Sequence, residues 1–142
     1  LAKLSGRPIA ALLKKKFAGA IYPVNPRKDT IMGLKAYPTI HDVPGTVDAA
    51  IIIVPAETAS RAIEECCEKG IPYIIVETAG FAETGEAGRK VQAHIKSVIS
   101  AGDHRLLGPN CSGIINTHHN MVQSIGIIDE LEKLTDALDI ES

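Results

Sequence analysis

The stretch Ala49-Ala50-Ile51-Ile52-Ile53-Val54-Pro55-Ala56 decides the fold of this chain of 142 residues. An unbroken run of β-branched residues fits a strand that is buried on both faces, as in a parallel sheet. Pro55 ends the strand because it has no amide hydrogen to continue a central ladder. The next segment, Glu57 to Gly70, has the period of an amphipathic helix, and its apolar positions are Ala59, Ala62, Ile63, Cys66 and Cys67. Ligands of open α/β sheets bind at the carboxyl ends of the strands, so we expect the functional site near Val54 to Thr58.

The same strand, turn and helix pattern repeats downstream. Residues 71–76 form another β-branched run, and it is followed by a polar turn and a helix that ends at Gly102. Four apolar side chains of that helix are expected to face the sheet: Val91, Ile95, Val98 and Ile99. A third strand over residues 104–107 leads into the turn Gly108–Gly113, and residues 114–116 are expected to form a last short strand. The sequence therefore predicts an α/β fold with a Rossmann-like, doubly wound parallel sheet in three layers.

The segment before the central strand contains a helix and a further predicted strand. Ser5 or Gly6 caps a helix with Pro8 in its first turn, and residues 20–25 read as a strand that leads into a turn. A doubly wound domain normally begins with a strand and a glycine-rich turn, so we expect its first strand to be lacking here. We predict an N-terminally truncated domain over residues 1–126 and an acidic helix or tail over residues 127–142.

Composition excludes several classes of function. The net charge of −2 and the 4% of aromatic residues argue against a nucleic-acid partner. No apolar run approaches the roughly 20 residues that cross a bilayer. We therefore expect a cytoplasmic location and no membrane partner. Three cysteines do not form a disulfide framework. The adjacent pair His118 and His119 would point in different directions, so no metal site is expected.

Polar residues follow each predicted strand. Arg27 and Lys28 stand where a phosphate would lie, although an exposed basic turn explains them equally well. Glu77 offers a carboxylate that could accept a hydrogen bond from a ribose or an adenine amine, and Thr78 offers a hydroxyl. Cys111 has no histidine or acid in a recognisable partner motif, which favours a packed thiol over a nucleophile.

Four motifs in order carry a family resemblance: YPVNPRKD from Tyr22, IIIVPAE from Ile51, ETAGFAETGEAG from Glu77 and LLGPNCSGIIN from Leu106. Together they resemble the CoA-binding domain of the nucleoside-diphosphate-forming acyl-CoA synthetases, the superfamily that includes the alpha subunit of succinyl-CoA synthetase. The resemblance covers nearly all of residues 3–117. It implies that coenzyme A binds along the carboxyl edge of the sheet as a substrate.

The resemblance also implies which residues contact CoA. Lys28 matches a lysine that contacts the nucleotide end, with Asn25 and Arg27 in the same turn. Two further groups match turns that contact the cofactor: Val54, Pro55 and Ala56, then Glu77, Thr78 and Ala79. Asn110 and Cys111 belong to a turn that lies beside the thiol end in this family.

The family carries its phosphorylated catalytic histidine and its nucleotide-grasp domain in other domains or subunits, which are the expected partners. None of the five histidines matches that motif, so we name no catalytic residue: His41, His94, His104, His118 and His119. We therefore expect a CoA-binding domain or fragment of an acid–thiol ligase, with enzymatic activity of this chain itself left open. The alternatives are a stand-alone, non-catalytic CoA-binding protein and, less favoured because GxGxxG is absent, an NAD-binding domain.

Overall fold

The centre of the molecule is a sheet of three parallel strands. The computed structural model describes residues 6–124 of the chain. The strands are β3 (Ala49–Ile52), β4 (Tyr73–Val76) and β5 (Arg105–Leu107), and they lie in the order β3-β4-β5. Two crossover helices connect them, α2 (Ala56–Glu68) and α3 (Glu86–Ser100). Each strand therefore lies beside the next one in sequence, as successive βαβ units require, and the predicted α/β class is confirmed.

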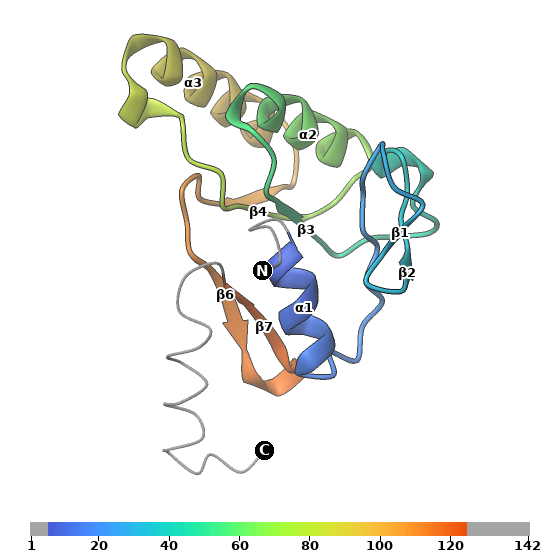
Figure 1. Cartoon of the computed structure of the whole chain (residues 1–142). Coiled ribbons are helices and arrows are strands. Elements are labelled where there is room, and N and C mark those ends of the chain that lie inside the picture. The colour runs from blue at the N-terminus through green and yellow to red at the C-terminus, as the bar shows by residue number, and fades with distance from the viewer. Residues whose placement is uncertain (1–5, 125–142) are drawn as a thin grey trace, which may run out of the picture.

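Helices α2 and α3 pack together on one face of the sheet, and α1 (Arg7–Lys14) lies on the other side (Figure 1). An apolar cluster fills the space between the sheet and the two crossover helices. Its fully buried members include Ala59 and Ile63 of α2, Ile74 and Val76 of β4, and Phe81. The predicted apolar register of α2 is confirmed, since Ala59, Ile63 and Cys66 are buried and Ala62 and Cys67 pack against the same cluster. Burial of this stripe is what holds α2 on the sheet.

The predicted register of α3 is only partly right. Ile95 is buried and Ile99 packs against the core, but Val91 is exposed. The first turns of α3 lie against η3 (Ala82–Thr84) rather than over the strands. Gly88 makes this contact, because a Cβ atom there would overlap the carbonyl oxygen of Phe81. At this end, α3 contacts η3 through Gly88 instead of contacting the sheet. Val91 therefore faces solvent.

The predicted strand over residues 20–25 is wrong as an element of the sheet. Only Val24 forms an isolated parallel bridge, with Tyr37. The amide of Asn25 donates to the Tyr37 carbonyl at 2.8 Å, and the amide of Tyr37 donates to the Pro23 carbonyl at 2.9 Å. Between Asn25 and Tyr37 the chain forms a small antiparallel hairpin of β1 (Thr30–Ile31) and β2 (Leu34–Lys35). Within residues 6–124, β3 pairs only with β4, so this segment is not part of the parallel sheet.

The predicted last strand exists but belongs to a second sheet. β6 (Gly113–Asn116) pairs antiparallel with β7 (Met121–Ser124), with the short helix η4 (Thr117–His119) in between. The sequence analysis did not predict β7. This hairpin packs against α1 below the parallel sheet (Figure 1). The predicted acidic segment 127–142 lies outside the described residues.

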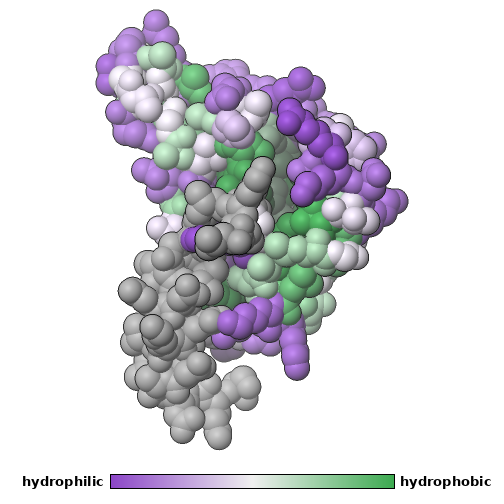
Figure 2. Space-filling model, viewed as in Figure 1, coloured by the Kyte–Doolittle hydropathy of each residue, from purple (hydrophilic) through white to green (hydrophobic). Residues whose placement is uncertain are grey.

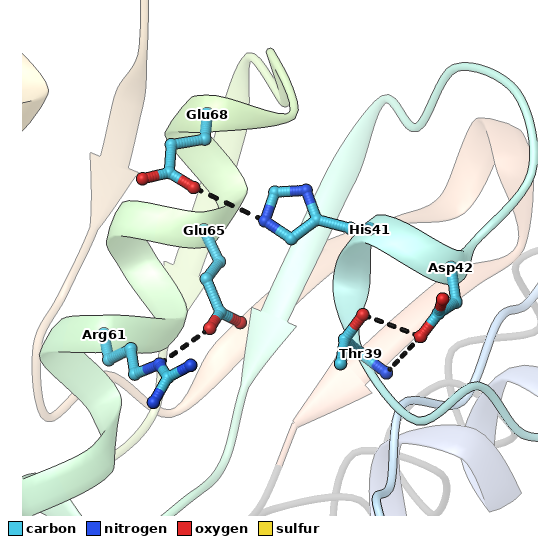
Figure 3. A network of polar contacts seen from close by, with 6 residues as sticks. All are labelled: Thr39, His41, Asp42, Arg61, Glu65 and Glu68. Atoms are coloured by element: carbon cyan, nitrogen blue, oxygen red, sulfur yellow. Dashed lines mark hydrogen bonds and ion pairs between the residues drawn. The ribbon is translucent and has the colours of Figure 1, made fainter.

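Polar contacts fasten the amino end of the sheet. The helix η2 (Ile40–Asp42) has a capping box, in which the Thr39 amide and hydroxyl both donate to the Asp42 carboxylate (Figure 3). His41 lies 3.4 Å from Glu68 in the last turn of α2. Next to it, the Lys69 ammonium donates to the Val43 carbonyl at 2.7 Å. These contacts hold the carboxyl end of α2, whereas the amino end of α2 lies beside the strand ends.

Hydrophilic residues line the periphery of the face seen in Figure 2, and apolar residues gather in its middle. Within residues 6–124, no helix is both long enough and apolar enough to cross a membrane.

Candidate functional site

The turns that follow β3, β4 and β5 meet at the carboxyl edge of the sheet. Thr78 joins all three. Its hydroxyl donates to the Val54 carbonyl at 2.7 Å, and its own carbonyl accepts from the Asn110 amide at 3.0 Å. The hydroxyl proton of Thr78 is therefore used within the protein, and only its oxygen lone pairs remain for a ligand.

The turn after β5 lies directly on the end of β4. The Cys111 amide donates to the Val76 carbonyl at 3.4 Å, and the Cys111 thiol lies 3.3 Å from the same oxygen. Gly108 has a φ of +107° and sits so close that a Cβ atom would overlap the Val76 carbonyl oxygen. Asn110 adopts a left-handed conformation with φ 55°. The predicted residues Asn110 and Cys111 are thus held against the strand that carries Glu77 and Thr78.

The turn after β4 is closed by a carboxylate. Glu83 accepts from the Gly80 amide at 2.7 Å and from the Phe81 amide at 3.2 Å. The hydrogen bond from Gly80 is the main cause that lowers the pKa of Glu83. Gly80 itself has φ 107°, and a Cβ atom there would lie 2.8 Å from the Cβ of Ala56. The turn after β4 therefore packs against the first residue of α2.

Glu77 is the one predicted site residue whose carboxyl is buried, with 5% of the residue exposed. Its backbone amide continues the hydrogen bonding between β3 and β4 by donating to the Ile52 carbonyl at 3.1 Å. Neither carboxyl oxygen has a hydrogen-bond partner. Burial without a partner raises the pKa of Glu77 from 4.5 to about 7.

Asn25, Arg27 and Lys28 belong to the turn that follows the bridge at Val24. The Asn25 side chain accepts from the Arg27 amide at 2.9 Å, which closes the turn, and Arg27 and Lys28 are exposed. No hydrogen bond or ion pair among the described residues links this turn to the strand ends. Eight of the eleven predicted residues are brought together at one edge: Val54, Pro55, Ala56, Glu77, Thr78, Ala79, Asn110 and Cys111.

A cavity of about 510 Å³ adjoins this edge on the side of the crossover helices. Its apolar lining includes Ile95, Ile99 and Leu106, and Gly108 and Pro109 of the turn after β5 also line it. Across residues 6–124 there is no group of three or more histidine, cysteine or acidic side chains that could hold a metal ion. The edge offers backbone groups, small side chains and one buried carboxyl.

Sequence reasoning missed two residues that shape the site. Glu83 stands three residues after Gly80, and an acidic residue at that distance from a turn glycine is a signal of a side chain that caps turn amides. The sequence around Gly108 indicates only a turn. The close contact of Gly108 with the Val76 carbonyl oxygen could not be predicted, because the two residues lie far apart in the sequence.

A parallel sheet with crossover helices, whose strand-end turns gather at one edge, defines a Rossmann-like ligand-binding domain. Comparison with known proteins makes this more specific. The chain belongs to the family described as CoA binding domain, whose model matches residues 2–117. Coenzyme A is therefore the ligand that family membership assigns to it.

Relatives include subunits and chains of CoA ligases. The chain is 40% identical to the alpha subunit of ADP-forming acetate–CoA ligase II of Pyrococcus furiosus, with 84% of this chain and 26% of that subunit aligned. It is 38% identical to ADP-forming acetate–CoA ligase II of Archaeoglobus fulgidus, with 86% of this chain and 18% of the ligase aligned. The chain spans less than a third of the length of these relatives.

The structure is also similar to that of a solved ligase. Acetyl-coenzyme A synthetase 1 of Ca. Korarchaeum cryptofilum, a dinucleotide-forming enzyme in its apo form, superimposes with a TM-score of 0.82 and 33% identity. The alignment covers 88% of this chain and 27% of that one. The chain thus matches the CoA-binding region of such synthetases.

Proposed function

We propose that this chain is the CoA-binding domain of an acid–thiol ligase that joins a carboxylic acid to CoA and forms a nucleoside diphosphate. The observation that carries the proposal is the match of residues 2–117 to the CoA binding domain, together with 38–40% identity to ADP-forming ligases. That identity favours a ligase domain over a stand-alone CoA-binding protein. The gathered turns at the carboxyl edge give the ligand a place to bind.

The charges and apolar surfaces of the chain suit the two ends of CoA. Arg27 and Lys28 are exposed cations in a turn closed by Asn25, and they would offset the negative charge of the CoA phosphates. Val54 is 38% exposed beside Thr78, so apolar surface is available there for the uncharged pantetheine arm. We accordingly assign the nucleotide end to the turn of Lys28 and the pantetheine arm to the three strand-end turns.

The catalytic groups belong to further domains or to a second subunit in this proposal. The relatives are several times longer than this chain, and one is named as an alpha subunit. Three histidines of this chain already have partners: His94 with Glu64 at 2.6 Å, His41 with Glu68, and His104 with the Ile71 carbonyl at 2.9 Å. We propose that the phosphorylated histidine and the nucleotide-grasp domain lie in those partners.

The remaining parts of the proposal concern boundaries and location. We keep residues 1–126 as the CoA-binding domain and residues 127–142 as a separate acidic segment. A cytoplasmic location is supported by Cys66, Cys67 and Cys111, all of which are free thiols.

Calorimetric titration of the chain with CoA, with NAD and ATP as controls, tests the function. We expect CoA alone to bind. Lys28→Ala should weaken CoA binding by about 1 to 3 kcal/mol, the range of one charge-assisted contact. Lys90→Ala, which removes an exposed cation from α3, is the matched control and should leave the affinity unchanged. Binding of NAD without CoA would refute the proposal, and equal losses in the two variants would refute the role of Lys28.

A further inference from the structure

The cavity of about 510 Å³ beside β5 has a helix wall and a strand wall. The helix wall is one face of α3, on which lining residues recur every three or four positions. They are Arg89, Gln92, Ala93, Lys96 and Ile99. Leu106 of β5 and the turn residues Gly108 and Pro109 form the second wall. Within residues 6–124, β5 pairs only with β4, so the cavity lies at the outer edge of the parallel sheet.

The floor of the cavity is apolar. Ile95 is buried, whereas Ile99 and Leu106 are half-buried and pack against the core cluster. All three also line the cavity, so side chains of the core reach its surface. Covering apolar surface with an apolar ligand is favourable by about 25 cal/mol per Å². Since the volume is also that of a small-molecule site, the cavity suits a ligand with an apolar chain.

The polar side chains that line the cavity offer hydrogen-bond donors. Gln92 accepts from the Ala82 amide at 3.1 Å through Oε1, which leaves the N–H groups of its side-chain amide to donate. Lys96 is exposed, and its ammonium forms no hydrogen bond or ion pair with any of residues 6–124. The two side chains are neighbours on α3, because residues four apart lie one above the other on a helix. One oxyanion can therefore accept from both of them.

Arg89 lines the same cavity but is already paired. Its Nη2 and Nε atoms lie 3.0 and 3.3 Å from Oε2 of Glu86. None of the lining residues in the described part of the chain is acidic, so the charge of Lys96 is not offset within the cavity. A carboxylate brings the single negative charge that Lys96 matches. A phosphate group carries more charge and needs further cations beside it, which this largely apolar lining does not supply.

We propose that this cavity binds a free carboxylic acid with an extended apolar chain. The chain packs on Ile95, Ile99 and Leu106, and the carboxylate accepts hydrogen bonds from Lys96 and Gln92. Both parts of the ligand are needed, since an exposed ion pair contributes at most about 1 kcal/mol on its own. No contact with CoA enters this site, so it stands or falls independently of the proposed function.

The test is a titration of the full chain followed by heteronuclear NMR, with octanoate, octan-1-ol and acetate as probes. Octanoate carries the chain and the charge, octan-1-ol the chain alone, and acetate the charge alone. We expect octanoate to shift the backbone amide signals of Lys96, Ile99 and Leu106, and acetate to leave them unchanged. These three probes test the site on the unaltered protein, before any substitution is made.

Two substitutions on α3 isolate the contact with the carboxylate. Lys96→Gln should weaken octanoate binding about tenfold and leave octan-1-ol binding unchanged. Lys90→Gln removes another exposed cation of α3, which does not line the cavity, and is the matched control that should change neither affinity. Ala93→Trp fills the cavity from an exposed position and should weaken both octanoate and octan-1-ol. Urea unfolding of each variant verifies that it is folded.

Several results would overturn the inference. Absence of octanoate binding, or octanoate shifts that lie away from α3 and β5, would show that the cavity is not the site. Acetate binding as tight as octanoate binding would contradict the apolar floor. Equal octanoate affinities of Lys96→Gln and Lys90→Gln would refute the contact between the carboxylate and Lys96.

Discussion

Replacing Glu77 by leucine is expected to stabilise the free protein, and by an amount that grows as the pH rises. In the folded chain the pKa of Glu77 is raised from 4.5 to about 7 because the residue is only 5% exposed and its carboxyl has no partner. The folded state therefore holds the proton more tightly than the unfolded chain. The burial cost of ionised Glu77 is absent below about pH 4.5, accumulates between about 4.5 and 7, and is complete above that window.

The shift sets the size of the effect. About two and a half pH units at about 1.4 kcal/mol each give about 3.5 kcal/mol. Relative to Glu77→Leu, the wild type should lose about that much free energy of unfolding between pH 4.5 and 7, and no more above it. The leucine also removes the unpaired polar atoms, which adds a gain that does not depend on pH.

Urea unfolding of the wild type and of Glu77→Leu across this pH range measures the difference. Glu57→Gln, which removes an exposed carboxyl from the first turn of α2, is the matched control for loss of one acidic group. A difference between Glu77→Leu and the wild type that stays constant from pH 4 to pH 8 would refute the reasoning, because it would mean that the carboxyl is solvated or already paired.

Three further substitutions test how the turns are held, each measured by urea unfolding. Thr78→Val removes the hydroxyl that donates to the Val54 carbonyl and should cost about 1 to 2 kcal/mol; no loss would show that this bond does not hold the turns together. Gly108→Ala should cost at least about 3 kcal/mol of unfolding free energy, because φ is +107° and the new Cβ overlaps a backbone oxygen. The control Gly45→Ala, with φ +68° and open space around it, should cost about 1 kcal/mol. Equal costs for the two variants would contradict the close approach of Gly108 to Val76. Glu83→Gln should destabilise the protein at neutral pH, and the difference from the wild type should shrink as the pH falls through the lowered pKa of Glu83; a difference that grows on acidification would contradict the two amide bonds to its carboxylate.

The elements that the sequence predicted correctly are those whose signal is local. The β-branched runs at β3 and β4 and the apolar stripe of α2 depend on the period of the side chains alone. The family resemblance in the four motifs was confirmed by the match to the CoA binding domain. Residues 20–25 have strand composition, but a strand exists only where a neighbour pairs with it, and the described structure gives this segment one bridge.

The candidate site shows the same division. Sequence reasoning placed the functional turns at the strand ends, and eight of the eleven predicted residues are brought together there. It read Thr78 as a hydroxyl for the ligand, whereas the proton of that hydroxyl is donated to Val54, 24 residues earlier in the chain. Val91 has the helical spacing of a core residue and is exposed, because η3 and Gly88 hold that end of α3 away from the strands.

The sequence by itself determined the order of the three parallel strands, the turns after them and the two crossover helices, and through its motifs the family of the chain. It did so because hydrophobic period, glycine and proline act on the backbone within a few residues. Only the tertiary structure decided which atoms meet: Thr78 with Val54 and Asn110, Cys111 with Val76, and Glu77 with no partner at all. These contacts depend on the register of parallel strands and on the packing of turns that lie tens of residues apart, and burial of a carboxyl is a property of all its neighbours at once.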